Sequence, residues 1–238
     1  MAVGDHSSKQ YDQELEAMRS RVLEMGGLVE SQLKMAIEAF ERADGELADR
    51  VIQTDRRVNE LEIDLDRAVH HIIARRQPTA GDLRMITGVA KAITDLERIG
   101  DESTKVARAA KWLREKEKSF RVNRIPDIRL SGDAATIMLH KSLDAFARMD
   151  AQAAAQLIDE DEGIDERFRA ILRQLITFMM EDPRTISHAI EILFIAKAIE
   201  RIGDHAKNMS EYVVYMVKGK DVRHTGAEAI EREALAQL

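Results

Sequence analysis

The chain contains no cysteine, and only 3 prolines and 4% aromatic residues occur among its 238 residues. The absence of cysteine excludes disulfide bonds, thiolate metal ligands and a cysteine nucleophile, and it is compatible with a reducing cytoplasm. Few prolines and aromatic residues, combined with long runs of Ala, Leu, Ile, Glu, Arg and Lys, favour long helices over sheets. We therefore expect an all-α protein.

Two further absences narrow the function. No window approaches the roughly 18 apolar residues of a membrane-spanning helix, and Met1–Gln10 lacks the apolar core of a signal peptide. The net charge is −7, with both signs interspersed, which argues against binding to the phosphate backbone of nucleic acids. We expect a soluble protein with no membrane insertion and no nucleic-acid partner, whose acidic surface suits cations or basic proteins.

One short sequence occurs twice, because Glu97–Asp101 and Glu200–Asp204 share the residues Glu-Arg-Ile-Gly-Asp. At ordinary residue frequencies such a coincidence has odds of roughly one in a hundred in a chain of this length, so an internal duplication is the better explanation. Pro78 and Pro183 are separated by nearly the same interval. The repeat predicts two similar domains.

Apolar residues recur at intervals of three and four along most of the chain, as they do on one face of an α-helix. Breaks at Asp44-Gly45 and Pro78 divide the first half into helices over about 11–42, 45–76 and 80–116. The second half repeats the plan over about 132–149, 151–180 and 183–218. Short loops require antiparallel neighbours, so we predict two tandem antiparallel three-helix bundles, 11–118 and 132–219, in an elongated molecule.

The remaining segments lack this periodicity. We predict a disordered N-terminus (1–10), a linker (119–131) in which Pro126 prevents a continuing helix, and a polar C-terminal tail (220–238). Several of the scarce aromatic residues lie near predicted helix ends, where they are either partner-binding anchors or, more simply, caps of the bundles: Trp112, Phe120, Tyr212 and Tyr215.

Each copy of the repeat carries a Glu and an Asp four residues apart. On a helix, Glu97 and Asp101 project from one face roughly 6 Å from each other, as do Glu200 and Asp204. Their helical positions lie just beside the predicted apolar seam. The glycine inside each copy costs about 1 kcal/mol relative to alanine in a helix interior, which predicts that a neighbouring helix or a ligand comes close to it.

The second helix of each half has a matching polar pair, Asp55 with Asn59 and Asp161 with Asp165. A three-helix bundle can bring the second of these pairs together with the acids of Glu200–Asp204, and such carboxylates suit hard or borderline metal cations. Salt bridges to nearby lysines and arginines explain the same acids as a solvated surface. Both interpretations stay open. His205 is a lesser candidate ligand, because a lone histidine at a helix edge is more often exposed or hydrogen bonded.

Known catalytic motifs are missing from the sequence. It has no pair of Glu-x-x-His motifs, no His-Glu-x-x-His, no Walker loop and no Gly-x-Ser-x-Gly elbow. We expect a non-enzymatic protein whose long helical faces bind partners. The alternatives are a metal-dependent enzyme or metal store on the acidic faces, and a structural helical spacer.

The repeated motif and several other segments resemble the PhoU family, the accessory and regulatory proteins of bacterial phosphate-specific transport. The resemblance spans nearly the whole chain and is carried by Asp95–Asp101, Ile199–His205, Ala74–Pro78 with Asp82–Arg84, and Glu211–Val213 with Val217–His224. It implies a cytoplasmic homodimer that represses the phosphate-starvation response and limits phosphate uptake. The implied partners are a phosphate-sensing histidine kinase and the ATPase of the phosphate ABC transporter.

Some members of this family bind metal through Glu/Asp-x-x-x-Asp motifs. The matching positions form three complete pairs and one that lacks its second carboxylate: Glu97 with Asp101, Glu200 with Asp204, Asp161 with Asp165, and Asp55 with Asn59. The resemblance therefore implies metal ions such as iron, manganese, magnesium or zinc, with the second half as the better candidate.

Overall fold

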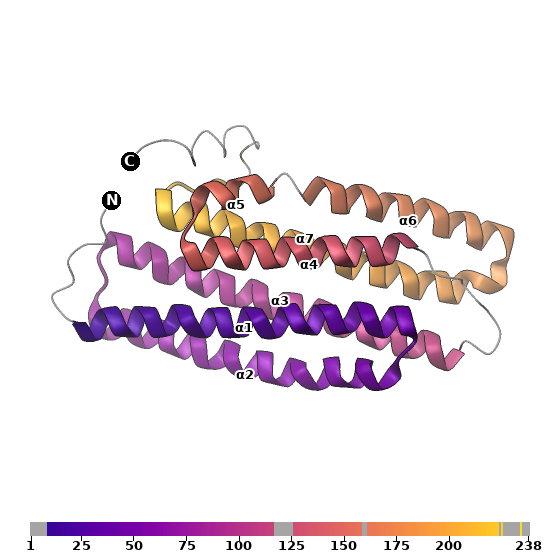
Figure 1. Ribbon diagram of the computed structural model, residues 1–238, viewed down its shortest axis with the longest axis horizontal. Helices are drawn as coiled ribbons and strands as arrows, with labels where there is room; N and C mark the ends of the chain where they lie inside the picture. The colour runs from indigo at the N-terminus through magenta and orange to yellow at the C-terminus, as the bar shows by residue number, and fades with distance from the viewer. Residues whose placement is uncertain (1–8, 117–125, 159–160, 224, 226–233, 235–238) are drawn as a thin grey trace.

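The computed structural model describes residues 9–116, 126–158, 161–223, 225 and 234, and those residues contain helices and turns but no strand. Long helices run along the long axis of an elongated molecule (Figure 1). The expected all-α class and the repeated helical bundles are confirmed.

The first half is a bundle of α1 (Lys9–Arg42), α2 (Gly45–Arg76) and α3 (Ala80–Lys116). The side chain of Asp44 caps α2 by accepting hydrogen bonds from the backbone N–H groups of Glu46 and Leu47. Gln77 ends α2 in the left-handed conformation, with φ 47°, directly before Pro78. Thr79 Oγ1 then donates to Asp82 Oδ2 at 3.2 Å, so the two residues of the capping pattern contact each other through their side chains.

The second half contains α4 (Pro126–Arg148), α5 (Ala151–Ile158), α6 (Asp161–Glu181), the 3₁₀ turn η1 (Pro183–Thr185) and α7 (Ile186–Lys218). The connection between α4 and α5 repeats the connection between α1 and α2. Ala43 and Met149 both have left-handed φ angles, 50° and 51°, and each precedes an aspartate. Gly219, with φ 75°, ends α7. The duplication therefore extends to the backbone of the turns.

The structure corrects two expected boundaries. Pro126 opens α4 instead of lying in a linker, because the first turn of a helix does not need the N–H group that proline lacks. Ile128 and Ser131, which follow it, are buried, so the second bundle begins at residue 126 and not at 132. The helix expected over 151–180 is divided into α5 and α6.

The terminal segments agree with the expectation only in part. Helix α1 already begins at Lys9, within the N-terminus that was expected to be disordered, and Val222 of the expected polar tail is buried. Residues 1–8, residues 119–125 of the expected linker, and most of the tail lie outside the described residues.

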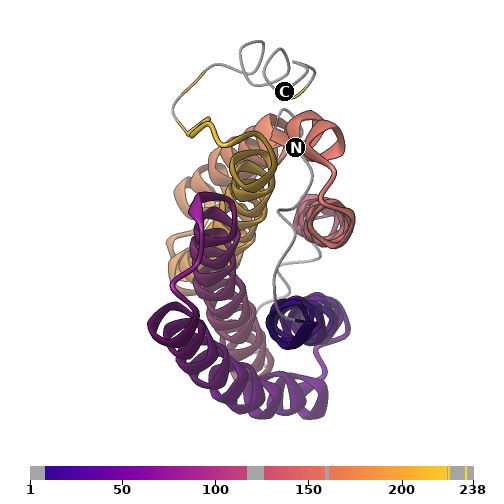
Figure 2. The same ribbon diagram turned by 90° about the vertical axis from the view of Figure 1, so that its left-hand side faces the viewer.

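The two bundles meet along α3 and α7, which cross the centre of the molecule in antiparallel directions (Figure 1). Seen along the helices, α1 and α2 pack beside α3, while α4 and α5 pack beside α7 (Figure 2). α1 and α4 lie on the same face of the α3–α7 pair and contact each other. The central helices approach closely, because a Cβ atom at Gly88 of α3 would lie only 2.5 Å from Cγ of Met216 on α7. One core therefore runs through both halves.

Candidate functional site

The glycine of each repeated motif lies where a second helix crosses closely. A Cβ atom at Gly203 would lie 2.9 Å from Ile164 Cδ1 and 3.3 Å from Asp161 Oδ1 of α6, and one at Gly100 would lie 3.3 Å from Val58 Cγ1 of α2. Glycine therefore lets an aspartate-bearing helix approach the Glu-Arg-Ile-Gly-Asp segment in both halves. The close approach that the sequence predicts is present.

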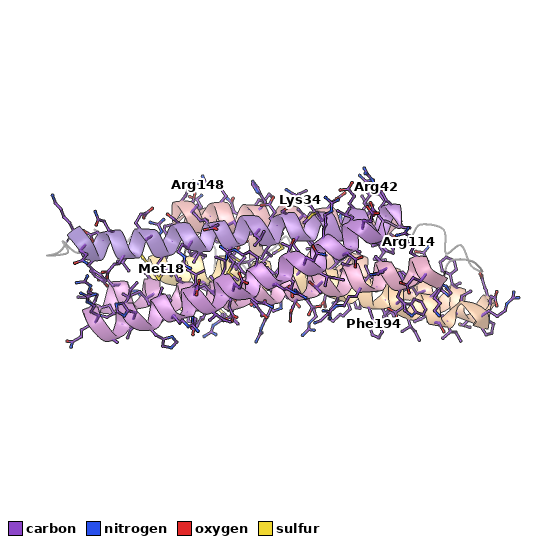
Figure 3. The ribbon with its side chains drawn as sticks, turned by 90° about the horizontal axis from the view of Figure 1, so that it is seen from below. Met18, Lys34, Arg42, Arg114, Arg148 and Phe194 are labelled. Atoms are coloured by element: carbon purple, nitrogen blue, oxygen red, sulfur yellow. The ribbon has the colours of Figure 1, made fainter. Side chains whose placement is uncertain are left out.

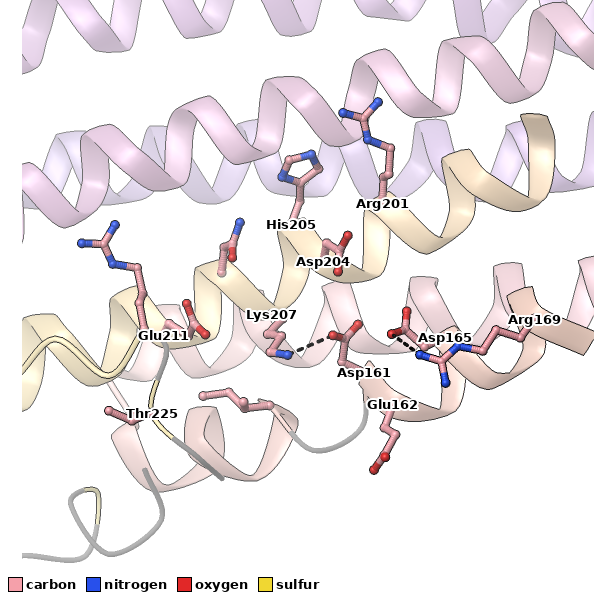
Figure 4. Close-up of a pocket in the computed structure, with 13 residues that line it drawn as sticks. Asp161, Glu162, Asp165, Arg169, Arg201, Asp204, His205, Lys207, Glu211 and Thr225 are labelled. Atoms are coloured by element: carbon pink, nitrogen blue, oxygen red, sulfur yellow. Dashed lines mark hydrogen bonds and ion pairs between the residues drawn. The ribbon is translucent and has the colours of Figure 1, made fainter. Parts of the chain in front are cut away.

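In the second half the structure brings the four expected carboxyl groups together. Asp161 and Asp165 extend from α6 toward Asp204 of α7 (Figure 4). The pKa of Asp204 is raised to about 6, first because surrounding protein displaces water from its carboxyl group, and then because Glu200, Asp161 and Asp165 add negative charge nearby. The carboxyl group nevertheless keeps an exposed side toward solvent. We call these four residues the second acidic face.

Basic side chains partly neutralise the second acidic face. Lys207 Nζ lies 3.1 Å from Asp161 Oδ2, Lys197 pairs with Glu200, and Arg169 lies 3.9 Å from Asp165. Two carboxylate oxygens, Asp161 Oδ1 and Glu200 Oε2, are buried and have no hydrogen-bond partner among the described residues. The face thus combines ion pairs with unused acceptors.

The second acidic face suits a metal cation in its chemistry but not in its present arrangement. Carboxylate oxygens are the donors that hard cations prefer, and the two unused oxygens are free to accept one. Within the described part of the chain, however, no three carboxylate or imidazole groups are close enough to one another to hold a metal. Metal binding would require Lys207 and Lys197 to leave their carboxylate partners.

The first half forms a similar but less acidic arrangement. Asp55 on α2 and Asp101 on α3 both lie near Glu97, whose pKa is raised by partial burial and then by Asp101, Glu62 and Asp55. We call Asp55, Glu97 and Asp101 the first acidic face. Here an amide donor is present, because Gln32 Nε2 lies 3.3 Å from Asp55 Oδ1.

Two neutral acceptors complete the first acidic face. The side-chain oxygens of Gln32 and Asn59 are buried without a hydrogen-bond partner among the described residues. Lys105 follows Asp101 by four residues, the spacing of a helical salt bridge, but it binds Glu102 at 2.9 Å instead. The surface interpretation therefore lacks its expected ion pair in this half, while the missing carboxylate at Asn59 weakens the case for metal.

His205 does not join the second acidic face. Its side chain is directed toward α3 (Figure 4), where Nδ1 lies 2.7 Å from Asp95 Oδ1. Both side chains are buried. An ion pair crosses the same interface, since Arg201 of α7 lies 3.0 Å from the buried Glu102 of α3. These contacts join the two halves, and His205 has this structural partner in place of a metal-binding role.

Sequence reasoning missed Asp95 and Glu102, although the pattern contained a signal. Both occupy the apolar stripe of α3 that faces α7, whose buried members recur at intervals of three and four: Gly88, Ala92, Asp95, Ile99, Glu102 and Val106. A charged residue inside such a stripe predicts a buried partner on another helix.

A cavity of about 790 Å³ opens beside the second acidic face. Acidic and basic groups both line it, because Arg169, Arg201 and Arg223 surround the same space as Asp161, Asp204 and Glu211. The lining of the cavity is therefore of mixed charge.

None of the described helices combines the length and the apolar composition needed to cross a bilayer.

The chain matches the family model described as PhoU domain twice, over residues 22–110 and 128–213. It is 47% identical over 231 residues to the phosphate-specific transport system accessory protein PhoU of Serratia marcescens, covering 97% of this chain and 94% of the relative. The corresponding protein of Escherichia coli (strain K12) is 44% identical, with 95% of this chain and 93% of the relative covered.

Solved structures agree with this similarity. The crystal structure of PhoU from Pseudomonas aeruginosa superimposes with a TM-score of 0.85 at 43% identity, covering 88% of this chain and 100% of that chain. The phosphate transport system regulatory protein PhoU from Streptococcus pneumoniae gives 0.81 at 26% identity, covering 89% of this chain and 99% of that chain. The duplication, the fold and the motifs lead to one conclusion: the chain belongs to the PhoU family.

Proposed function

We propose that this protein is a negative regulator of the phosphate-starvation response and a modulator of phosphate uptake. It acts as a non-enzymatic adaptor between the phosphate ABC transporter and a phosphate-sensing histidine kinase. The observation that carries the proposal is the nearly full-length match, through both PhoU domains, to accessory proteins of phosphate-specific transport. Long exposed helical faces without a recognised catalytic motif suit partner binding better than catalysis.

Deletion of the gene tests this function directly. In medium rich in phosphate, the deletion strain should express alkaline phosphatase that the parent represses, and a copy of the intact gene should restore repression. Phosphatase that stays repressed in the deletion strain would contradict the regulatory proposal and favour a structural spacer. Uptake of labelled phosphate, which should rise in the deletion strain, checks the transport branch independently.

The remaining parts of the proposal concern assembly and location. We place the protein in the cytoplasm as a homodimer, on the strength of the family resemblance. Its partners there are the ATPase of the transporter and the cytoplasmic part of the kinase. Light scattering of the purified chain measures the oligomeric state, and a monomer at all concentrations tested would contradict the dimer.

A metal site on the acidic faces is a second candidate function. The raised pKa of Asp204 and the buried, unused oxygens of Asp161 and Glu200 favour it, because a cation would relieve both. Asp161, Asp165, Glu200 and Asp204 would hold the ion in the second half, and Asp55, Glu97 and Asp101 would hold one in the first. The bound cation would supply positive charge where the carboxylates now repel.

Elemental analysis of protein purified without chelator distinguishes the two interpretations of the acids. Stoichiometric iron, manganese, magnesium or zinc that is lost in a Glu200→Ala/Asp204→Ala variant would support the site. A Glu97→Ala/Asp101→Ala variant assigns any remaining metal to the first half. Protein free of metal would return both faces to an ordinary surface of ion pairs.

A further inference from the structure

An apolar groove lies between the C-terminal part of α3 and the N-terminal part of α7, and it borders the second acidic face at Lys197 and Arg201. Its volume is about 430 Å³, and its apolar lining comes from Ala109, Trp112, Phe194 and Ala198. We call it the Trp112 groove. The ring of Phe194 is 59% exposed and lies at the outer edge of the molecule (Figure 3). An exposed aromatic residue beside a concave apolar surface is typical of a protein-binding site.

The duplication supplies an internal comparison for this groove. Trp112 and Phe194 occupy the same positions of the repeat as Tyr215 and Lys91 at the opposite end of the α3–α7 interface. There the chain covers its own aromatic surface, since Lys91 Nζ lies 5.7 Å from the ring centroid of Tyr215. At the Trp112 end the corresponding lysine is replaced by Phe194, which is exposed to solvent. One side of Trp112 is already covered by His188, with ring centroids 5.6 Å apart, so the open side of the groove is the side toward Phe194.

The border of the Trp112 groove is basic. Four cationic side chains and two acidic ones line it: Lys105, Arg108, Lys197, Arg201, Glu102 and Glu191. Lys105 and Arg201 share the buried Glu102, and Lys197 pairs with Glu200. Four cations therefore stand against three acids (Glu102, Glu191 and Glu200), so the border keeps an excess of one positive charge. A basic border is unusual on a chain whose net charge is −7.

These features together indicate the chemistry of the occupant. We propose that the Trp112 groove binds an amphipathic helix of a partner protein, which inserts a large apolar side chain between Trp112 and Phe194 and carries acidic residues on its flanks. Two antiparallel helices form a channel suited to a third helix, and the basic border complements acidic flanks. A second copy of the chain suits it less well, because a two-fold contact would place the basic border against itself.

This inference rests on the proposed function, since it assigns a docking surface to the adaptor. Overlapping peptides that cover the transporter ATPase and the cytoplasmic region of the kinase serve as probes, with their tryptophans replaced by phenylalanine. The chain has a single tryptophan, so the fluorescence of Trp112 reports on the groove itself. An acidic amphipathic peptide should shift the emission to shorter wavelength and protect Trp112 from acrylamide quenching.

Substitutions in the full-length chain test the assignment. Phe194→Ala should weaken binding of that peptide about tenfold or more, and Arg108→Glu should weaken it and reduce its salt dependence. Ile137→Ala, which removes an apolar side chain of similar exposure (54%) from α4, and Arg173→Glu on the exposed side of α6 are the matched controls. Both should bind like the parent, and circular dichroism checks that all four variants keep their helices.

Several outcomes would overturn the groove assignment. The first is no change in Trp112 fluorescence with any peptide. The second is peptide binding by Phe194→Ala that is as tight as binding by the parent. The third is a dimer that is lost in Phe194→Ala while peptide binding is kept, which would make a second copy of the chain the occupant. If both intact partners bind the parent and Phe194→Ala equally, the groove assignment fails while the adaptor function stands. If neither partner binds and deletion leaves phosphatase repressed, the adaptor function fails as well.

Discussion

At the scale of single residues, Asp204 is a carboxyl group whose ionisation opposes folding. Its pKa is about 6 in the folded protein, against 3.8 for the free side chain. The folded state therefore binds a proton more tightly than the unfolded state, so the stability that protonation provides is complete below about pH 4 and is lost as the pH rises through 6.

Asp204→Asn should remove this pH dependence. In the presence of chelator we expect the free energy of unfolding to rise by about 1 kcal/mol above about pH 7, after allowance for solvent screening at this exposed carboxyl group. Near about pH 4 the variant and the parent should be equally stable. Urea denaturation at both pH values measures the difference. A gain of equal size at both would show that charge is not its cause.

The buried contact between Asp95 and His205 supports the second prediction. His205→Ala leaves the Asp95 carboxylate in the interior with only weaker partners, so we expect a loss of about 3 kcal/mol in the free energy of unfolding. Asp95→Ala/His205→Ala should lose less than the sum of the single substitutions, because neither member is then left alone. Additive losses in urea denaturation would contradict a direct interaction.

The sequence predicted part of the site at this scale. The repeat identified Glu97, Asp101, Glu200 and Asp204, because identical neighbours on equivalent helices must occupy equivalent positions. It did not predict the contact of His205 with Asp95. A single helical periodicity shows which face is buried but not which helix covers it, so pairing across the two halves could not be deduced.

At the scale of the helices, two adjacent glycines of α1 have opposite surroundings. A Cβ atom at Gly26 would lie 2.3 Å from Leu143 Cδ2 on α4, whereas one at Gly27 would have no neighbour within 4 Å among the described residues. The first glycine permits contact between the bundles, and the second has no such role.

Alanine substitutions at these two positions should therefore change stability in opposite directions. Gly27→Ala should increase the free energy of unfolding by about 1 kcal/mol, because alanine favours the helix. Gly26→Ala should decrease it by about 1–3 kcal/mol through overpacking against Leu143. Thermal denaturation of the two variants provides the comparison, and equal stabilisation by both would show that α1 and α4 are not in close contact.

Helix boundaries could be predicted where a polar cap or a proline marks them. The breaks at Asp44 and Pro78 were correct for this reason. The start of α4 was placed too late, because Pro126 was taken as an interruption instead of the first residue of a helix. The division between α5 and α6 could not be predicted, because no proline or helix cap marks it in the sequence and the charged residues around it also suit the surface of a continuous helix.

At the scale of the whole molecule, the two bundles should not behave as independent domains. α3 and α7 share a buried stripe that contains polar pairs as well as apolar residues, so separating the bundles would expose both. The sequence predicted the two repeats, which we expected to be tandem bundles. It did not predict the central interface that α3 and α7 share.

A single unfolding transition is the expected consequence. His205→Ala lies in the second PhoU domain, yet it should speed amide hydrogen exchange in α3 of the first domain as well as in α7. Hydrogen exchange measured by mass spectrometry would detect this, with Gly27→Ala as the control that leaves α7 unchanged. Two separate unfolding transitions, with faster exchange confined to the second domain, would contradict it.

The buried contacts between α3 and α7 also limit how the bundles can slide. A displacement of one helical turn, about 5.4 Å, would carry Arg201 away from Glu102 and His205 away from Asp95. Asp95 would lose its imidazole partner in the interior, and Glu102 would keep only Lys105 of its own helix. The alignment of the two domains along the molecule is consequently locked. If one protein binds at one end of the molecule and a second protein binds at the opposite end, the distance between the two bound proteins would stay constant.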